Sequence, residues 1–98
     1  MHIEPLIRRP AVEAQAQLDK LFAIGEPASG SALDQAGLRN GLEIIDDFLK
    51  NGEPGLALEH LVYMVTEPRL SLSMEARQDI ETAAKKMGML EAIRPFEP

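Results

Sequence analysis

Glycine and proline interrupt this chain at intervals of one short helix, and that spacing limits what it can fold into. The breaks fall around residues 25–30, 51–55, 67–68 and 88. Between them the sequence is rich in Ala, Leu, Glu, Gln and Lys, which are good helix formers. We therefore predict four helices, over about 10–24, from 31–34 to 50, over 54–66 and from 73 to about 86. The expected fold is all-α, a compact bundle of about four helices in a single domain spanning residues 1–98.

The expected boundaries rest on individual residues. Pro10 suits the first turn of a helix, so residues 1–9 are predicted to be an extended lead-in. The small and polar residues at 26–32 predict a mobile loop. Ser73 is a good N-cap, and Gly88 is typical of the position just after a helix.

Two sequence features bear on how the helices pack. The third predicted helix, 54–66, is apolar around most of its circumference, which is typical of a helix buried between others. Gly37 and Gly41 lie four residues apart inside the second predicted helix. They weaken that helix and permit close approach by a neighbouring element.

The net charge of the chain argues against some classes of binding partner. The chain has 16 acidic and 10 basic residues, a net charge of -6. Nucleic-acid binding and docking on anionic lipid both depend on Lys and Arg, so this balance argues against either partner and favours a basic protein. The chain has no cysteine, no apolar run long enough for a membrane span and no apolar signal-peptide core. We expect a soluble cytoplasmic protein.

Residues suited to catalysis are few. His60 has no histidine or cysteine at metal-ligand spacing, and His2 lies in the predicted lead-in. The serines lack a nucleophile-elbow context, and the glycines lack the lysine of a phosphate-binding loop. Asp46-Asp47 lacks the alternating ligands of a calcium loop. We expect no enzyme activity, no catalytic residue, no metal and no cofactor.

The candidate binding residues are acidic. If the second and third helices form an antiparallel hairpin, five carboxylates could share one edge with a tyrosine beside them: Glu43, Asp46, Asp47, Glu53, Glu59 and Tyr63. Tyrosine is enriched at protein interfaces. For any single residue the simpler reading is a solvated charged face, and Tyr63 could equally be a core residue with a satisfied hydroxyl.

Part of the sequence resembles a known family. Residues 44–49 (IIDDFL), 51–53 (NGE) and 55–61 (GLALEHL), followed by Glu67, Ser73 with Glu75, and 86–89 (KMGM), are similar to the MafI family of bacterial immunity proteins. The similarity covers roughly residues 40–90. It implies a small cytosolic protein that binds and neutralises the toxin domain of its own polymorphic-toxin or contact-dependent inhibition system. Such toxins are often nucleases, so the expected partner is a basic toxin domain.

Two other functions compete with this one. The apolar third helix and the Gly37/Gly41 pair would also suit a homodimeric helical adaptor or regulator with no toxin partner. A helix-turn-helix DNA-binding protein is disfavoured by charge, because the basic residues of the last helix (Arg77, Lys85 and Lys86) are balanced by its acidic ones (Glu75, Asp79 and Glu81).

Overall fold

The computed structural model describes residues 2–96 and contains only helices and loops over that range. Four α-helices follow one another along the chain: α1 (Glu4–Ile24), α2 (Gly41–Lys50), α3 (Pro54–Thr66) and α4 (Met74–Lys86). A short 3-10 helix, η1 (Leu90–Phe96), completes the fold. The predicted all-α bundle of about four helices is confirmed.

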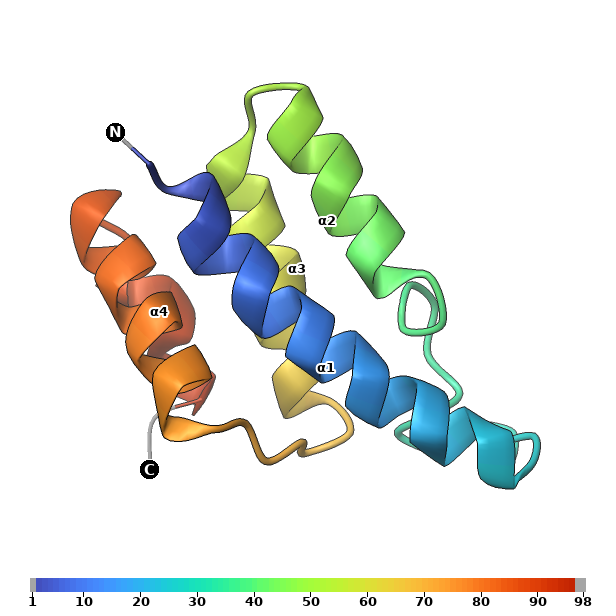
Figure 1. The fold of residues 1–98 in the computed structure, drawn as a ribbon. Helices are drawn as coiled ribbons and strands as arrows, with labels where there is room; N and C mark the ends of the chain where they lie inside the picture. Colours follow the sequence, from blue (N-terminus) through green and yellow to red (C-terminus); the bar gives the residue numbers. More distant parts are fainter. Residues whose placement is uncertain (1, 97–98) are drawn as a thin grey trace.

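Helix α1 organises the bundle. It packs against α2, α3 and α4, while α2 and α3 form an antiparallel hairpin. In Figure 1, α1 crosses the front of the molecule with α2 on one side, α4 on the other and α3 behind. Fully buried side chains from these helices and from the loop before α2 form one core that includes Ile7, Leu18, Leu38, Ile45, Leu58, Leu61, Met64 and Ile80. Helix α3 is the most apolar contributor, as its sequence predicts.

The extended lead-in predicted for residues 1–9 is wrong from Glu4 onward, and Met1 lies outside the described residues. Helix α1 begins at Glu4 and continues through Pro10, which lies inside it. Pro10 has no N–H to donate to the carbonyl of Leu6, and an interior proline ordinarily breaks a helix. Ile7, Pro10 and Ala11 are all buried against the other helices, and their burial offsets the missing hydrogen bond.

The second helix starts later than predicted. Residues 25–40 form a series of turns, and α2 begins at Gly41 rather than near 31–34. The Asp34 carboxylate accepts a hydrogen bond from the backbone N–H of Gly30, which closes a local turn that competes with helix formation. Gly37 adopts a φ of +84°, a left-handed conformation that no helix interior contains. The loop expected at 26–32 is therefore part of a longer one.

The close approach expected at Gly37 and Gly41 is present. A Cβ on Gly37 would lie 2.8 Å from His60 Cε1, and one on Gly41 would lie 2.5 Å from the Met64 Sδ and Cε atoms. His60 and Met64 are one turn apart on α3. The two glycines thus let α3 pack directly against the backbone that leads into α2.

Candidate binding surface

A shallow depression between α1 and α2 brings carboxylates together. It has a volume of about 420 Å³ and is lined by Gln15, Asp19, Arg39, Asn40, Leu42, Glu43, Asp46 and Asp47. Four of these residues are acidic and one is basic. We call this surface the acidic depression. It combines three of the predicted binding residues, Glu43, Asp46 and Asp47, with Asp19 of α1.

The three predicted acids of α2 differ in their surroundings. Glu43 and Asp47 are exposed, one turn apart on the solvent side of the helix, and neither carboxylate forms an ion pair within residues 2–96. Asp46 points to α1 and pairs with Arg8 through two contacts, Nε to Oδ1 at 3.0 Å and Nη2 to Oδ2 at 3.3 Å. Asp46 is therefore partly neutralised and holds α1 against α2. Glu43 and Asp47 are the freer of the three carboxylates.

The remaining predicted acids lie on α3, outside the acidic depression. Glu53 is the N-cap residue of α3, and its carboxylate makes no capping hydrogen bond. Glu59 is exposed further along the same helix. Both lie in the α2–α3 hairpin, but neither lines the depression.

Tyr63 holds the loop that precedes α2. Its hydroxyl donates to the carbonyl of Ala36 at 2.7 Å, and His60 Nε2 lies 3.0 Å from the carbonyl of Gly37. The two rings are in contact, with centroids 5.5 Å apart. Together they fasten the loop to α3. The hydroxyl of Tyr63 is thus satisfied within the chain, and only the partly exposed ring is left for a partner.

We expect Tyr63 to make stability sensitive to alkaline pH. Partial burial and the Glu67 carboxylate raise the pKa of its hydroxyl. As pH rises past about 10 the unfolded chain loses this proton first. The contribution to stability is therefore complete below that pH and is lost as pH rises through the folded-state pKa. The chain has one tyrosine and no tryptophan, so tyrosinate absorbance reports this group directly.

The folded protein should show a higher tyrosine titration midpoint than the same chain in urea. Tyr63→Phe removes the hydrogen bond to Ala36 and should cost about 1 kcal/mol at neutral pH. The variant should also lose less stability than the wild type between neutral and alkaline pH. Identical titration midpoints in the folded and unfolded states would contradict the assignment.

Gln15 lies beneath the acidic depression and was not anticipated from the sequence. The two N–H groups of its amide are shared among three acceptors, the carbonyls of Leu38 and Arg39 at 3.2 and 3.1 Å and the Asp19 carboxylate at 3.0 Å. Its amide oxygen accepts from the backbone N–H of Leu42 at 2.9 Å. The side chain is only 8% exposed. One buried glutamine thus positions both walls of the depression.

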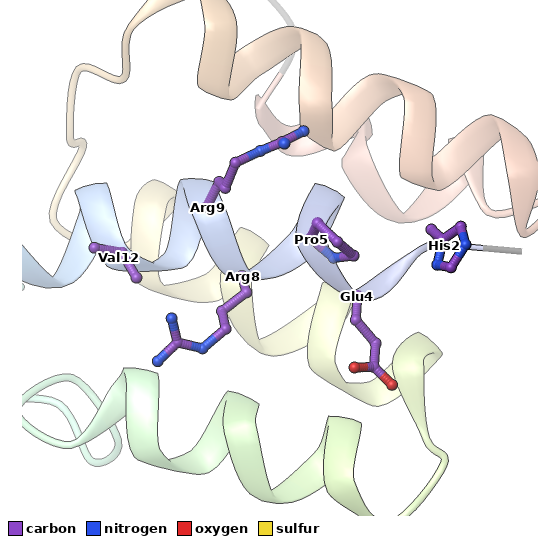
Figure 2. Close-up of a pocket in the computed structure, with 6 residues that line it drawn as sticks. All are labelled: His2, Glu4, Pro5, Arg8, Arg9 and Val12. Carbon is purple, nitrogen blue, oxygen red and sulfur yellow. The ribbon is translucent and has the colours of Figure 1, made fainter.

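A second hollow, of about 610 Å³, lies over the first three turns of α1 and is lined by His2, Glu4, Pro5, Arg8, Arg9 and Val12. Figure 2 shows Arg8 reaching toward α2 and Arg9 toward α4. Arg9 pairs with Asp79 of α4 through two contacts, of 3.1 and 3.0 Å. The charged groups of this hollow mainly connect α1 to its two neighbours.

Neither hollow provides the ligand set of a metal site: among residues 2–96, no three or more His, Asp or Glu side chains are grouped so as to hold an ion. Over the same residues, none of the helices combines the length and apolarity needed to cross a bilayer. No family model, curated protein or solved structure matches this chain.

Proposed function

We propose that this protein is an immunity protein that binds a cognate bacterial toxin domain and blocks it by occupancy, with a basic nuclease domain as the expected toxin. The observation that carries the proposal is the acidic depression, where Glu43 and Asp47 offer exposed, unpaired carboxylates beside Asp19 and Asp46. The sequence similarity of residues 40–90 to the MafI family gives the partner class.

Charge complementarity supports a nuclease as the partner. A nuclease must carry a cationic surface to hold phosphates. An acidic, shallow surface on a partner of net charge -6 complements it. Such complementarity steers encounter and raises association rates by factors of about 10–10³ at low salt. Fast capture suits an inhibitor that must reach a toxin before the toxin acts.

The two sequence features that would suit a homodimeric adaptor are mostly used within the chain. Most of the apolar surface of α3 is buried within the chain, with Leu56 exposed, and the space beside Gly37 and Gly41 is filled by His60 and Met64. Both features are therefore used for folding, and we favour the toxin partner.

The test is binding to the toxin domain encoded next to this chain's gene. The wild-type chain should co-purify with that domain and rescue the growth of cells that produce it. Glu43→Lys with Asp47→Lys should slow association at least about 10-fold at low salt, because these carboxylates are exposed and unpaired. Asp46 is left in place, since its loss would also remove the Arg8 pair between α1 and α2.

A matched control separates local charge from net charge. Glu4→Lys with Glu81→Lys makes the same charge change at two exposed positions, on α1 and α4, outside the acidic depression. The exposed ion pair of Glu81 with Lys85 is also removed, but such a pair contributes little to stability. This control should slow association much less than the α2 variant. Equal slowing by the two variants would show that the depression is only a solvated face. Absence of both binding and rescue by the wild-type chain would reject the proposed function.

A further inference from the structure

Helices α2, α3 and α4 end in the same backbone motif. In α3 the position that is glycine in the other two helices holds an arginine. In a Schellman motif, one residue past the helix takes a left-handed conformation while two N–H groups bond back to the last turn. Helix α2 ends this way, with Gly52 N bonded to the carbonyl of Leu49 and Glu53 N to that of Phe48. Helix α4 does the same at Gly88.

Helix α3 closes the same motif with an arginine. Arg69 N bonds to the carbonyl of Thr66, and Leu70 N bonds to that of Val65 at 2.8 Å. Arg69 has a φ of +55°, beside +71° for Gly52 and +65° for Gly88. Among residues 2–96 it is the one non-glycine with a positive φ. A residue with a Cβ is strained in this region, whereas glycine is not.

Contacts within the chain do not explain why an arginine is present at position 69. Arg8, Arg9, Arg39 and Arg94 each form an ion pair with a carboxylate. The exposed guanidinium of Arg69 has no hydrogen bond or ion pair with any of residues 2–96. Strained backbone is concentrated at functional positions, where a side chain is needed despite its cost.

The loop that carries Arg69 is held in place from α1. Gln17 Nε2 donates to the carbonyl of Ser71 at 2.7 Å. The Glu13 carboxylate accepts from both the backbone N–H and the hydroxyl of Ser73, at 2.6 and 2.7 Å. Loop residues 67–73 are thus fixed before any partner arrives. Directly after them, Met74 is 71% exposed, although a methionine would gain from burial.

We propose that this loop, with Arg69 and Met74, is a second contact region for the toxin partner. The inference rests on the proposed function and names a partner surface that offers a carboxylate to Arg69 and an apolar area to Met74. Arginine and methionine are both enriched at protein interfaces. Arg69 has the opposite charge to the carboxylates of the acidic depression, in a loop that also carries Glu67 and is neutral overall. A partner that matches both is held in one orientation, which gives specificity beyond fast association.

The experiment measures binding of full-length variants to the neighbouring toxin domain, together with thermal unfolding of each free chain. Arg69→Gly should weaken binding at least about 10-fold, mainly through faster dissociation. It should also raise the unfolding midpoint by about 4 °C, because glycine relieves the strain. Arg69→Lys keeps the charge, and its affinity for the toxin domain should lie between those of the wild type and Arg69→Gly. Gly52→Arg is the matched control, with a lowered midpoint and unchanged binding.

The outcomes separate the two proposals. Equal binding by the wild type and Arg69→Gly would overturn this inference and leave the proposed function standing. A lower midpoint for Arg69→Gly would show that Arg69 stabilises the fold, and would also overturn it. Failure of the wild-type chain to bind the toxin would reject the proposed function itself, and this inference with it.

Discussion

Replacing Gln15 with leucine is expected to lower the free energy of unfolding by about 2–4 kcal/mol. Leucine fills a similar volume but cannot form the bonds to Leu38, Arg39 and Leu42. The carbonyl of Arg39 and the N–H of Leu42 then lose their partner at a part-buried site, while the carbonyl of Leu38 keeps only the 3.4 Å bond from the N–H of Gly41. A buried polar group without a partner costs roughly 1–3 kcal/mol, which makes this a larger loss than that of an exposed hydrogen bond.

Gln17 supplies a matched control on the same helix. It makes one hydrogen bond, to the carbonyl of Ser71, at an exposed site. Gln17→Leu should therefore cost less than about 1 kcal/mol, because water can replace the lost donor. Urea unfolding followed by helical circular dichroism measures both variants. If Gln15→Leu and Gln17→Leu lowered the free energy of unfolding equally, the buried bonds of Gln15 would contribute no more than the exposed bond of Gln17.

Hydrogen exchange locates the effect of Gln15→Leu. The N–H of Leu42 lies in the first turn of α2 and has the Gln15 oxygen as its acceptor. Its exchange should become faster in Gln15→Leu and stay unchanged in Gln17→Leu. The loop 25–40 and the start of α2 are thus expected to loosen together while α4 keeps its protection.

The sequence predicted best those helices whose two ends are both marked by local chemistry. Helix α3 spans Pro54–Thr66 as expected, between a proline in its first turn and Pro68 beyond its end. Helix α4 starts after Ser73, whose hydroxyl accepts from the N–H of Ala76. Such signals act within four residues, so they can be recognised without knowledge of the packing.

The sequence failed where distant contacts decide the local structure. Pro10 is typical of a helix start, but α1 continues through it because its neighbours are buried. Residues 33–40 have the composition of a helix, yet they form turns that are held by Gln15 and Tyr63 from other elements. For Pro10 the deciding partners are distant in the sequence. For residues 33–40 the distant bonds from Gln15 and Tyr63 act together with the local turn between Asp34 and Gly30.

The acidic depression likewise contains residues whose proximity the sequence predicts and residues whose proximity depends on packing. Glu43, Asp46 and Asp47 share α2, so their proximity follows from helical spacing alone. Asp19 joins them only because α1 packs beside α2, and Arg8 reaches Asp46 for the same reason. Tyr63 was expected either at the interface or satisfied within the core. Its hydroxyl bonds to Ala36 within the chain, while its role toward a partner stays a prediction.

Gly41→Ala is expected to destabilise the protein by about 1–3 kcal/mol, although the usual effect has the opposite sign. Alanine inside a helix normally gains about 0.5–1 kcal/mol over glycine. Here the new Cβ would lie 2.5 Å from the Sδ and Cε atoms of Met64. Met64 is fully buried, so its side chain cannot retreat into solvent and must displace its neighbours in the core.

A double-mutant cycle tests this cause. Met64→Val removes the Sδ and Cε atoms, which lie nearest to the new Cβ, and by itself it should destabilise the protein through a cavity. Combined with Gly41→Ala it should cost less than the sum of the two single changes, because the added methyl group occupies part of that cavity. Greater stability of Gly41→Ala than of the wild type in urea unfolding would contradict the close packing. If the two changes in the free energy of unfolding simply added, the strain would not come from the contact between the new Cβ and Met64. A shared contact requires the two substitutions to compensate each other in part.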